Sequence, residues 1–292
     1  MTDISFSINL LADLQMMWQY DFMQHAFEAG TIIAIIAGIV GYFVVLRRSS
    51  FAAHALSHVG FAGAAGAVLF GIDPIIGLLS FTSVGGITMA ILSRRSGSRD
   101  VQIGTVLAFM LGIGVLFISL YSGYATEAYS ILFGEILGIS SNDVLVTLVA
   151  SLIILISTAI VYRPLLFSSL DEDVAEAMGL PTLFLGIIFM ILVAVATSIA
   201  VQVVGVLLIF SLMVTPAAIA QRFAKRPLNG IMISVFIALI ATWFGLFISF
   251  YEPYPVSFFI TSIVFAVYIL TLIFQKINTS LISGRLSSLK GS

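Results

Sequence analysis

The chain has 292 residues, of which 60% are hydrophobic and only 9% are charged, whereas about a quarter of the residues in an average soluble domain are charged. So few charged side chains cannot cover the surface of a soluble protein of this length, which excludes soluble enzymes, nucleic-acid-binding proteins and disordered tails. The absence of cysteine excludes a disulfide, a thiol nucleophile and a thiolate metal site.

The first 29 residues contain acidic residues but no Lys or Arg, so they lack the basic region of a secretory signal. We expect residues 1–29 to form an external amphipathic segment at the membrane surface. Trp18 and Tyr20 within it are suited to the membrane interface.

Nine apolar runs come next, and each is long enough to cross a bilayer, which takes about 20 residues. They lie at about 30–46, 52–70, 75–92, 101–120, 144–162, 182–200, 203–221, 229–250 and 256–274. Only Val201 and Gln202 separate the sixth run from the seventh, so the pair forms a tight hairpin, two short helices or one broken segment. The sequence therefore predicts an all-α, polytopic membrane protein with eight or nine transmembrane helices within residues 30–275.

The twelve Lys and Arg residues indicate the orientation of the chain. If nine segments alternate from an external N-terminus, all twelve fall on one side, which the positive-inside rule places in the cytoplasm. We therefore predict an external N-terminus and a cytoplasmic tail over residues 276–292. Acidic residues such as Asp73 and Glu252 collect on the external side, where they either form a cation-collecting mouth or are indifferent to topology.

Two of the three histidines, His54 and His58, lie inside a predicted span, where an ionisable side chain is by default a candidate functional residue. Their i, i+4 spacing places both rings on one face of a helix, about 6 Å apart. Neutral imidazole is a good ligand for zinc and other transition metals, although a pair of interhelical hydrogen bonds would use the same residues. The pattern is not H-E-x-x-H, so a hydrolytic zinc site lacks its general base.

Residues 132–143 are short for a span and end in a Ser-Ser-Asn-Asp cluster that resembles a helix N-cap. We expect a short helix at the outer face here. Glu135 within it is either a contact for a cation or an ordinary surface carboxylate. The sequence assigns no role to Asp143 or to His25.

The longest polar cytoplasmic insert, residues 168–181, carries helix start and stop signals. Ser169 or Asp171 can cap a helix with acidic residues in its first turn, and Gly179 then ends it before Pro181 opens the next span. Such a helix across the cytoplasmic face is either a docking element for a soluble partner or a solvated connection. In the paired apolar runs, the in-span Thr215-Pro216 bends the helix and forms a hinge, a cavity wall or a kink.

Four motifs in order make the chain similar to the permeases of bacterial zinc, manganese and iron ABC importers, the metal-chelate or ZnuB-like type. They are Ala55-Leu-Ser-His58 with its glycine-rich tail, Leu132-Phe-Gly-Glu-Ile-Leu-Gly138, Asp171-Glu-Asp-Val-Ala175 with Gly179, and Gln202-Val-Val-Gly205 through Pro216-Ala-Ala218. The resemblance runs from about residue 28 to 275. It implies a type II ABC importer permease in the bacterial cytoplasmic (inner) membrane, with the orientation and the multi-pass topology that the charges and the apolar runs predict.

The resemblance also implies the partners and the site. It predicts a permease homodimer, two ATPase subunits docking on residues 169–180 through Asp171, Glu172, Ala175 and Gly179, and an extracytoplasmic metal-binding protein. His58 matches the histidine that lines the metal path in the family, whereas His54 stands where the family usually has aspartate. Replacing a carboxylate with imidazole favours zinc over manganese or iron, so we expect zinc to be the transported metal, with no stably bound cofactor.

The chain contains no G-x-x-x-x-G-K-[ST] loop, so ATP would be bound by a separate subunit. We expect a permease and not an enzyme, with lipid and no nucleic acid among its partners. The alternative is a secondary metal transporter or channel that works without ATPase subunits. Such a protein would need a buried carboxylate relay, and no predicted span interior contains Asp or Glu.

Overall fold

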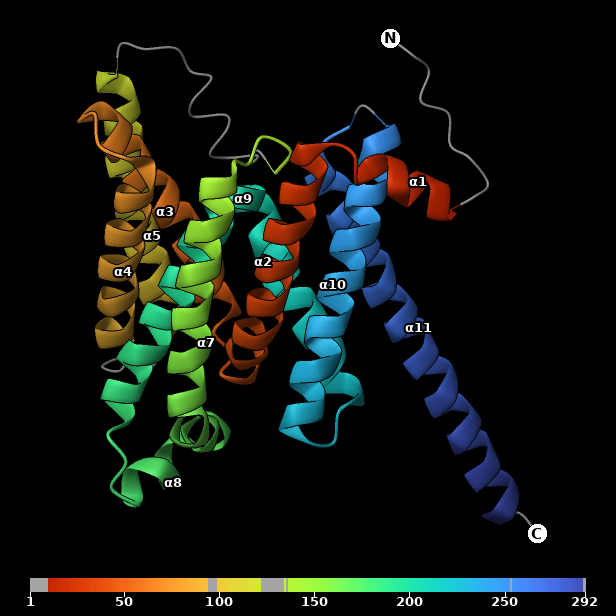
Figure 1. Ribbon diagram of the computed structural model, residues 1–292. Coiled ribbons are helices and arrows are strands. Elements are labelled where there is room, and N and C mark those ends of the chain that lie inside the picture. Colours follow the sequence, from red (N-terminus) through yellow and green to blue (C-terminus); the bar gives the residue numbers. More distant parts are fainter. Residues whose placement is uncertain (1–9, 94–98, 122–133, 135, 253, 291–292) are drawn as a thin grey trace.

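The computed structural model describes residues 10–93, 99–121, 134, 136–252 and 254–290, and all regular structure in these residues is helical (Figure 1). Eight helices are long and apolar enough to cross a membrane. They are α2 (Asp21–Leu46), α3 (Ser50–Leu69), α4 (Pro74–Leu92), α5 (Arg99–Leu120), α7 (Ser141–Leu170), α9 (Thr182–Phe223), α10 (Pro227–Tyr251) and α11 (Val256–Lys290). Two short helices, α1 (Leu10–Met17) and α8 (Glu172–Ala177), complete the described elements. The prediction of an all-α polytopic membrane protein is confirmed.

The chain reverses direction within α9, at Gly205. This residue has φ 82° and ψ 165°, which is not helical and is a conformation open essentially to glycine alone. Before it, Gln202 donates to Asp143 at the start of α7, and after it, Gln221 donates to the Tyr42 carbonyl near the end of α2. The two arms of α9 therefore run in opposite directions (Figure 1). Eight helices thus make nine passes, and the sixth and seventh apolar runs form the tight hairpin.

The nine passes give the bundle two distinct ends (Figure 1). We call them the α1 end, which also holds Gly205 and the start of α7, and the α8 end, which also holds the last residues of α11. The described basic residues all belong to the α8 end. They are Arg47, Arg48, Arg99, Arg163, Arg222, Lys225, Arg226, Lys276 and, near the end of α11, Arg285 and Lys290. The structure therefore places the described Lys and Arg residues at one end of the bundle, as the prediction of a single basic side requires.

Several helices extend beyond the apolar runs that predict them. Helix α2 begins at Asp21, nine residues before the run at 30–46, and α7 continues to Leu170, past the run at 144–162. Helix α11 stays helical through residue 290. Hydropathy marks the part of a helix that lipid covers, whereas the helix itself continues wherever its backbone hydrogen bonds persist.

Glycines set the packing of α3 against its neighbours. A side chain on Gly63 would meet the Gly77 carbonyl of α4, and one on Gly66 would meet the Phe117 ring of α5. In lipid the hydrophobic effect does not drive helices together, so their association depends on close packing. Small residues allow that close approach of the backbones. The glycine-rich part of α3 therefore fixes the position of the helix that carries both candidate histidines.

In the segment predicted as a short outer helix, Leu132, Phe133 and Glu135 lie outside the described residues. Residues 136–140 form a turn and an irregular stretch instead of a helix, and α7 begins at Ser141. At the start of α7, the Ser140 hydroxyl caps the helix by accepting from the Asp143 amide, and the Asp143 carboxylate accepts from the Ser140 amide at 3.1 Å. This reciprocal capping box confirms that the polar cluster before the fifth apolar run starts a helix.

Candidate metal and partner sites

The first candidate site is the histidine pair on α3. The ring centroids of His54 and His58 lie 4.7 Å apart, with the ring planes at 82°. Both side chains are half-buried. The i, i+4 spacing thus brings the two imidazoles together on one face, as predicted from the sequence.

The surroundings of the pair favour a ligand over interhelical hydrogen bonds. His54 Nδ1 is buried and has no hydrogen-bond partner among the described residues. Phe210, on the second arm of α9, lies edge-on to the His54 ring at 4.7 Å, and the Ser57 hydroxyl donates to the His54 carbonyl instead of to the ring. Within the described part of the chain, the His54 ring nitrogen Nδ1 is therefore not held by an interhelical hydrogen bond, which was the alternative explanation of the pair.

The pair is not a complete metal site within one chain. Among the described residues, no cluster of three or more His, Cys, Asp or Glu side chains could hold a metal ion. Two imidazoles supply half of a tetrahedral coordination shell. Such a partial site suits an ion in transit better than a structural metal, which is bound by a closed shell.

The second candidate site is α8, whose predicted start and stop signals are both present. The Asp171 carboxylate caps the helix by accepting from the Val174 amide at 3.0 Å. At the other end Gly179 has φ 82°, and the Gly179 and Leu180 amides donate to the Glu176 and Ala175 carbonyls. This pattern is a Schellman motif, which stops a helix at a left-handed residue.

The structure shows which face of α8 is available to a partner. Ala175, expected from the resemblance to contact the ATPase, is 0% exposed and packs against the permease itself. Val174 is 47% exposed and Met178 is 71% exposed. The sequence analysis did not identify these two residues. Their i, i+4 spacing within a polar insert is nevertheless the signal of an apolar patch on one helix face. They replace Ala175 as the exposed apolar face of α8.

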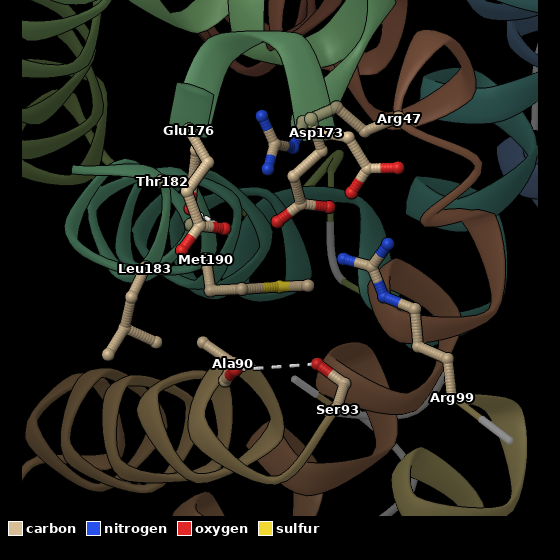
Figure 2. Close-up of a pocket in the computed structure, with 11 residues that line it drawn as sticks. Arg47, Ala90, Ser93, Arg99, Asp173, Glu176, Thr182, Leu183 and Met190 are labelled. Carbon is tan, nitrogen blue, oxygen red and sulfur yellow. Dashed lines mark hydrogen bonds between the residues drawn. The ribbon is translucent and has the colours of Figure 1, made fainter. Parts of the chain in front are cut away.

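A charged cavity of about 280 Å³ lies on the other side of α8, between this helix and the ends of α2, α4, α5 and α9. Figure 2 shows Arg47, Arg99 and Asp173 pointing into it from different elements. Burial lowers the pKa of the Arg47 guanidinium below its ordinary value, and the nearby Glu172 carboxylate opposes that shift. An arginine nevertheless remains charged, so Arg47 is a cation held beside α8.

At the α1 end, apolar and backbone contacts hold the segment that leads into α7, beside a cavity of about 390 Å³. Ile136 and Ile139 are 6% and 8% exposed and belong to the main core. The Ile139 carbonyl accepts from His25 Nδ1 at 3.2 Å, and Gly134 approaches the backbone of Gly205 too closely for a side chain. His25, for which the sequence assigned no role, thus joins α2 to the segment that leads into α7.

Known proteins share this architecture. The model of the ABC 3 transport family matches residues 19–275. The manganese transport system membrane protein MntC of Listeria innocua is 30% identical over 238 residues, which cover 81% of this chain and 85% of that protein. The manganese import system permease protein ScaB of Streptococcus gordonii is 31% identical, with the same two coverages. The solved structure of PsaBC from Streptococcus pneumoniae in complex with Fab matches with a TM-score of 0.80 and 28% identity, over 90% of this chain and 95% of that chain.

The nine-pass bundle and these similarities define a multi-pass membrane permease of a metal ABC transporter. The chain belongs to the ABC 3 transport family. The family predicted from the four sequence motifs is therefore confirmed, and its named members are transport proteins instead of enzymes. The expected preference for zinc is not supported, because the relatives are named for manganese.

Proposed function

We propose that this chain is the permease of an importer that carries a divalent transition metal across the bacterial cytoplasmic membrane. The observation that carries the proposal is the His54 and His58 pair, which places two adjacent nitrogen donors inside a span. A transit site must release its ion as readily as it captures it. Two donors on one helix, which supply only part of a coordination shell, meet that requirement.

Manganese is the first candidate for the transported ion because the relatives are named for it. Zinc is the second candidate, and His54 is the observation that favours it. Imidazole suits zinc, whereas manganese prefers carboxylate oxygen. A second copy of the chain that faces the first would add two imidazoles and complete a four-nitrogen shell, which is why we propose a homodimer around one path.

The energy source is a separate ATPase, since the chain has no phosphate-binding loop. We place the ATPase on α8, where Val174 and Met178 present an apolar patch next to the Glu172 carboxylate. In a homodimer, two copies of α8 would accept two ATPase subunits. An extracytoplasmic metal-binding protein would deliver the ion at the α1 end, away from the cations of the α8 end.

The test is uptake of radiolabelled manganese, zinc and iron into vesicles that contain the permease with its ATPase and its binding protein. We expect ATP-dependent uptake, lowered more than about tenfold by His58→Ala because a metal ligand is lost. His25→Gln removes the remaining imidazole, outside the pair, but keeps a donor for the Ile139 carbonyl, and it is the matched control with unchanged uptake. His54→Asp should retain transport and raise manganese uptake relative to zinc, since oxygen replaces nitrogen.

Two outcomes contradict the proposal. Uptake by the permease alone, without ATPase subunits and without ATP, would identify a secondary transporter or channel. Unchanged uptake in the double variant His54→Ala/His58→Ala, at wild-type abundance, would show that the histidine pair is structural.

A further inference from the structure

Arg47 is a buried cation whose hydrogen-bond partners are neutral. It is 8% exposed, and its Nη1 donates to Ser168 Oγ at 3.0 Å and to Ser169 Oγ at 3.3 Å. Its guanidinium also lies 5.1 Å from the centroid of the Phe189 ring. Burying a charge is costly unless an opposite charge or a dense set of hydrogen bonds compensates. Two hydroxyls and one ring contact Arg47 directly, and the nearby Glu172 carboxylate of α8 supplies the opposite charge. The electrostatic environment of Arg47 therefore depends on where α8 lies.

The contacts of Arg47 join the elements on both sides of α8. Ser168 and Ser169 lie in the last turn of α7, and the cap of α8, Asp171, comes two residues later. Phe189 lies in the first arm of α9, which continues the chain after α8. A displacement of α8 would therefore reach Arg47 through both flanking helices.

Arg47 is also rigidly connected to the helix that carries the histidine pair. It ends α2, and Arg48 comes next with φ 53°. The Arg48 amide donates to the Val45 carbonyl at 3.0 Å, and the Ser49 amide donates to the Val44 carbonyl at 2.8 Å, before α3 begins at residue 50. This Schellman motif leaves no flexible loop between the two helices, so a force on the Arg47 guanidinium is passed to the start of α3, one turn before His54.

The face of α8 that carries Glu172, Asp173 and Glu176 borders a cavity. The cavity of about 280 Å³ separates α8 from the end of α4 and from Arg99 at the start of α5 (Figure 2). Closely packed elements move only as a unit. The cavity leaves α8 room to move toward α4 and α5, and Arg47, which lines the same cavity, contacts the last turn of α7 just before α8.

We propose that Arg47 is the positioning residue that transmits movement of α8 to the His54 and His58 pair. ATP-driven displacement of α8 pulls on the last turn of α7, Arg47 carries that displacement across to the α2–α3 turn, and the first turns of α3 move with it. The proposal rests on the proposed function, since it assigns α8 to the ATPase and the histidines to the metal. It adds the physical connection between them.

The test measures ATP hydrolysis and the uptake of radiolabelled manganese and zinc in the same vesicles, with the full complex. Arg47→Gln should lower the metal transported per ATP hydrolysed about tenfold, because the coupling between two sites is lost while the ATPase remains active. Arg48→Gln removes the neighbouring, exposed arginine from the same turn and should leave the ratio unchanged. Arg47→Lys keeps the charge but not the forked geometry, so it should give an intermediate ratio.

The proposal is overturned if Arg47→Gln leaves the ratio of transport to hydrolysis at the wild-type value, whether both rates fall together or neither changes. If Arg47→Gln prevents assembly of the complex, the double variant Ser168→Ala/Ser169→Ala keeps the cation and removes its two acceptors. A wild-type ratio in that double variant would also overturn the proposal. Failure of the wild-type complex to transport metal would instead contradict the proposed function.

Discussion

The two ends of the bundle are held together by different interactions. At the α1 end, Gly134 lies against the backbone at Gly205, and the buried side chains of Ile136 and Ile139 join the core. At the α8 end, the helix is held by its caps, by Ala175 and by the Arg47 contacts to α7, and it borders a charged cavity that Arg47 also lines.

This difference shows which end is built to move. Backbone-to-backbone contact tolerates no displacement without a clash, because protein interiors are close-packed. A helix that is capped at both ends and borders a cavity can shift as a rigid unit. The backbone contact of Gly134 with Gly205 is therefore the fixed point of the α1 end, although a cavity of about 390 Å³ lies beside it. The α8 end is the place where an external force can enter.

The largest expected effect concerns which end faces outward. Asn142 at the α1 end and Ala177 at the α8 end are both exposed, and the chain has no natural cysteine. Because the described cations gather at the α8 end, we expect a membrane-impermeant maleimide to label Asn142→Cys, and not Ala177→Cys, on intact cells. Labelling of Ala177→Cys in lysed membranes is the control for its reactivity. Equal labelling of both on intact cells would contradict the orientation.

The next effect concerns the fixed point of the α1 end. Gly134 has φ 72°, and a Cβ there would meet the backbone of Val204 and Gly205. Gly134→Ala should therefore lower the free energy of unfolding by about 3 kcal/mol or more, through backbone strain and overpacking together. Thermal unfolding of the purified protein should show the midpoint reduced by about 5 °C or more.

A matched control for this substitution is Gly112→Ala in α5. Gly112 is exposed and helical, and a Cβ there would meet nothing within 4 Å. Since alanine is a better helix former than glycine, this change should raise stability by about 0.5–1 kcal/mol. If Gly134→Ala behaves like Gly112→Ala, the contact at Gly134 is not a fixed point.

Much of this organisation could be predicted from the sequence because it depends on local patterns. The passes can be derived from apolar run length, the imidazole pair from i, i+4 spacing, and the ends of α8 from Asp171 and Gly179. Each of these signals acts within a few residues of the chain. A local pattern is enough where the structure it produces is local.

Other features depend on contacts between distant segments and could not be predicted. The chain reverses at Gly205, and Pro216 lies inside a continuous helix arm. The exact position of the reversal could not be predicted, because the sequence does not show which glycine adopts a positive φ. Arg47 has the sequence context of an ordinary loop cation and is buried only because α7 and α9 cover it. The six-residue α8 is too short for periodicity to show that Ala175 faces inward.

The smallest expected effect concerns Gly179, which isolates backbone strain from packing. Its φ of 82° resembles the 72° of Gly134, yet a Cβ on Gly179 would meet nothing within 4 Å. Gly179→Ala should therefore lower the free energy of unfolding by only the strain of a left-handed residue, about 1–2 kcal/mol. The unfolding midpoint should fall by about 2–8 °C.

The Gly179 variant also tests how α8 is held. Since Asp171 still caps the helix and Ala175 still packs beneath it, ATP-dependent metal uptake by Gly179→Ala should match the wild type at equal protein abundance. A stability loss as large as that of Gly134→Ala would mean that α8 is packed as tightly as the α1 end, and the contrast between a fixed point and a movable helix would fail. A small loss of stability with normal uptake would show that Gly134→Ala is more destabilising because of its packing. Backbone strain would not explain the difference, since Gly134 and Gly179 both have a positive φ.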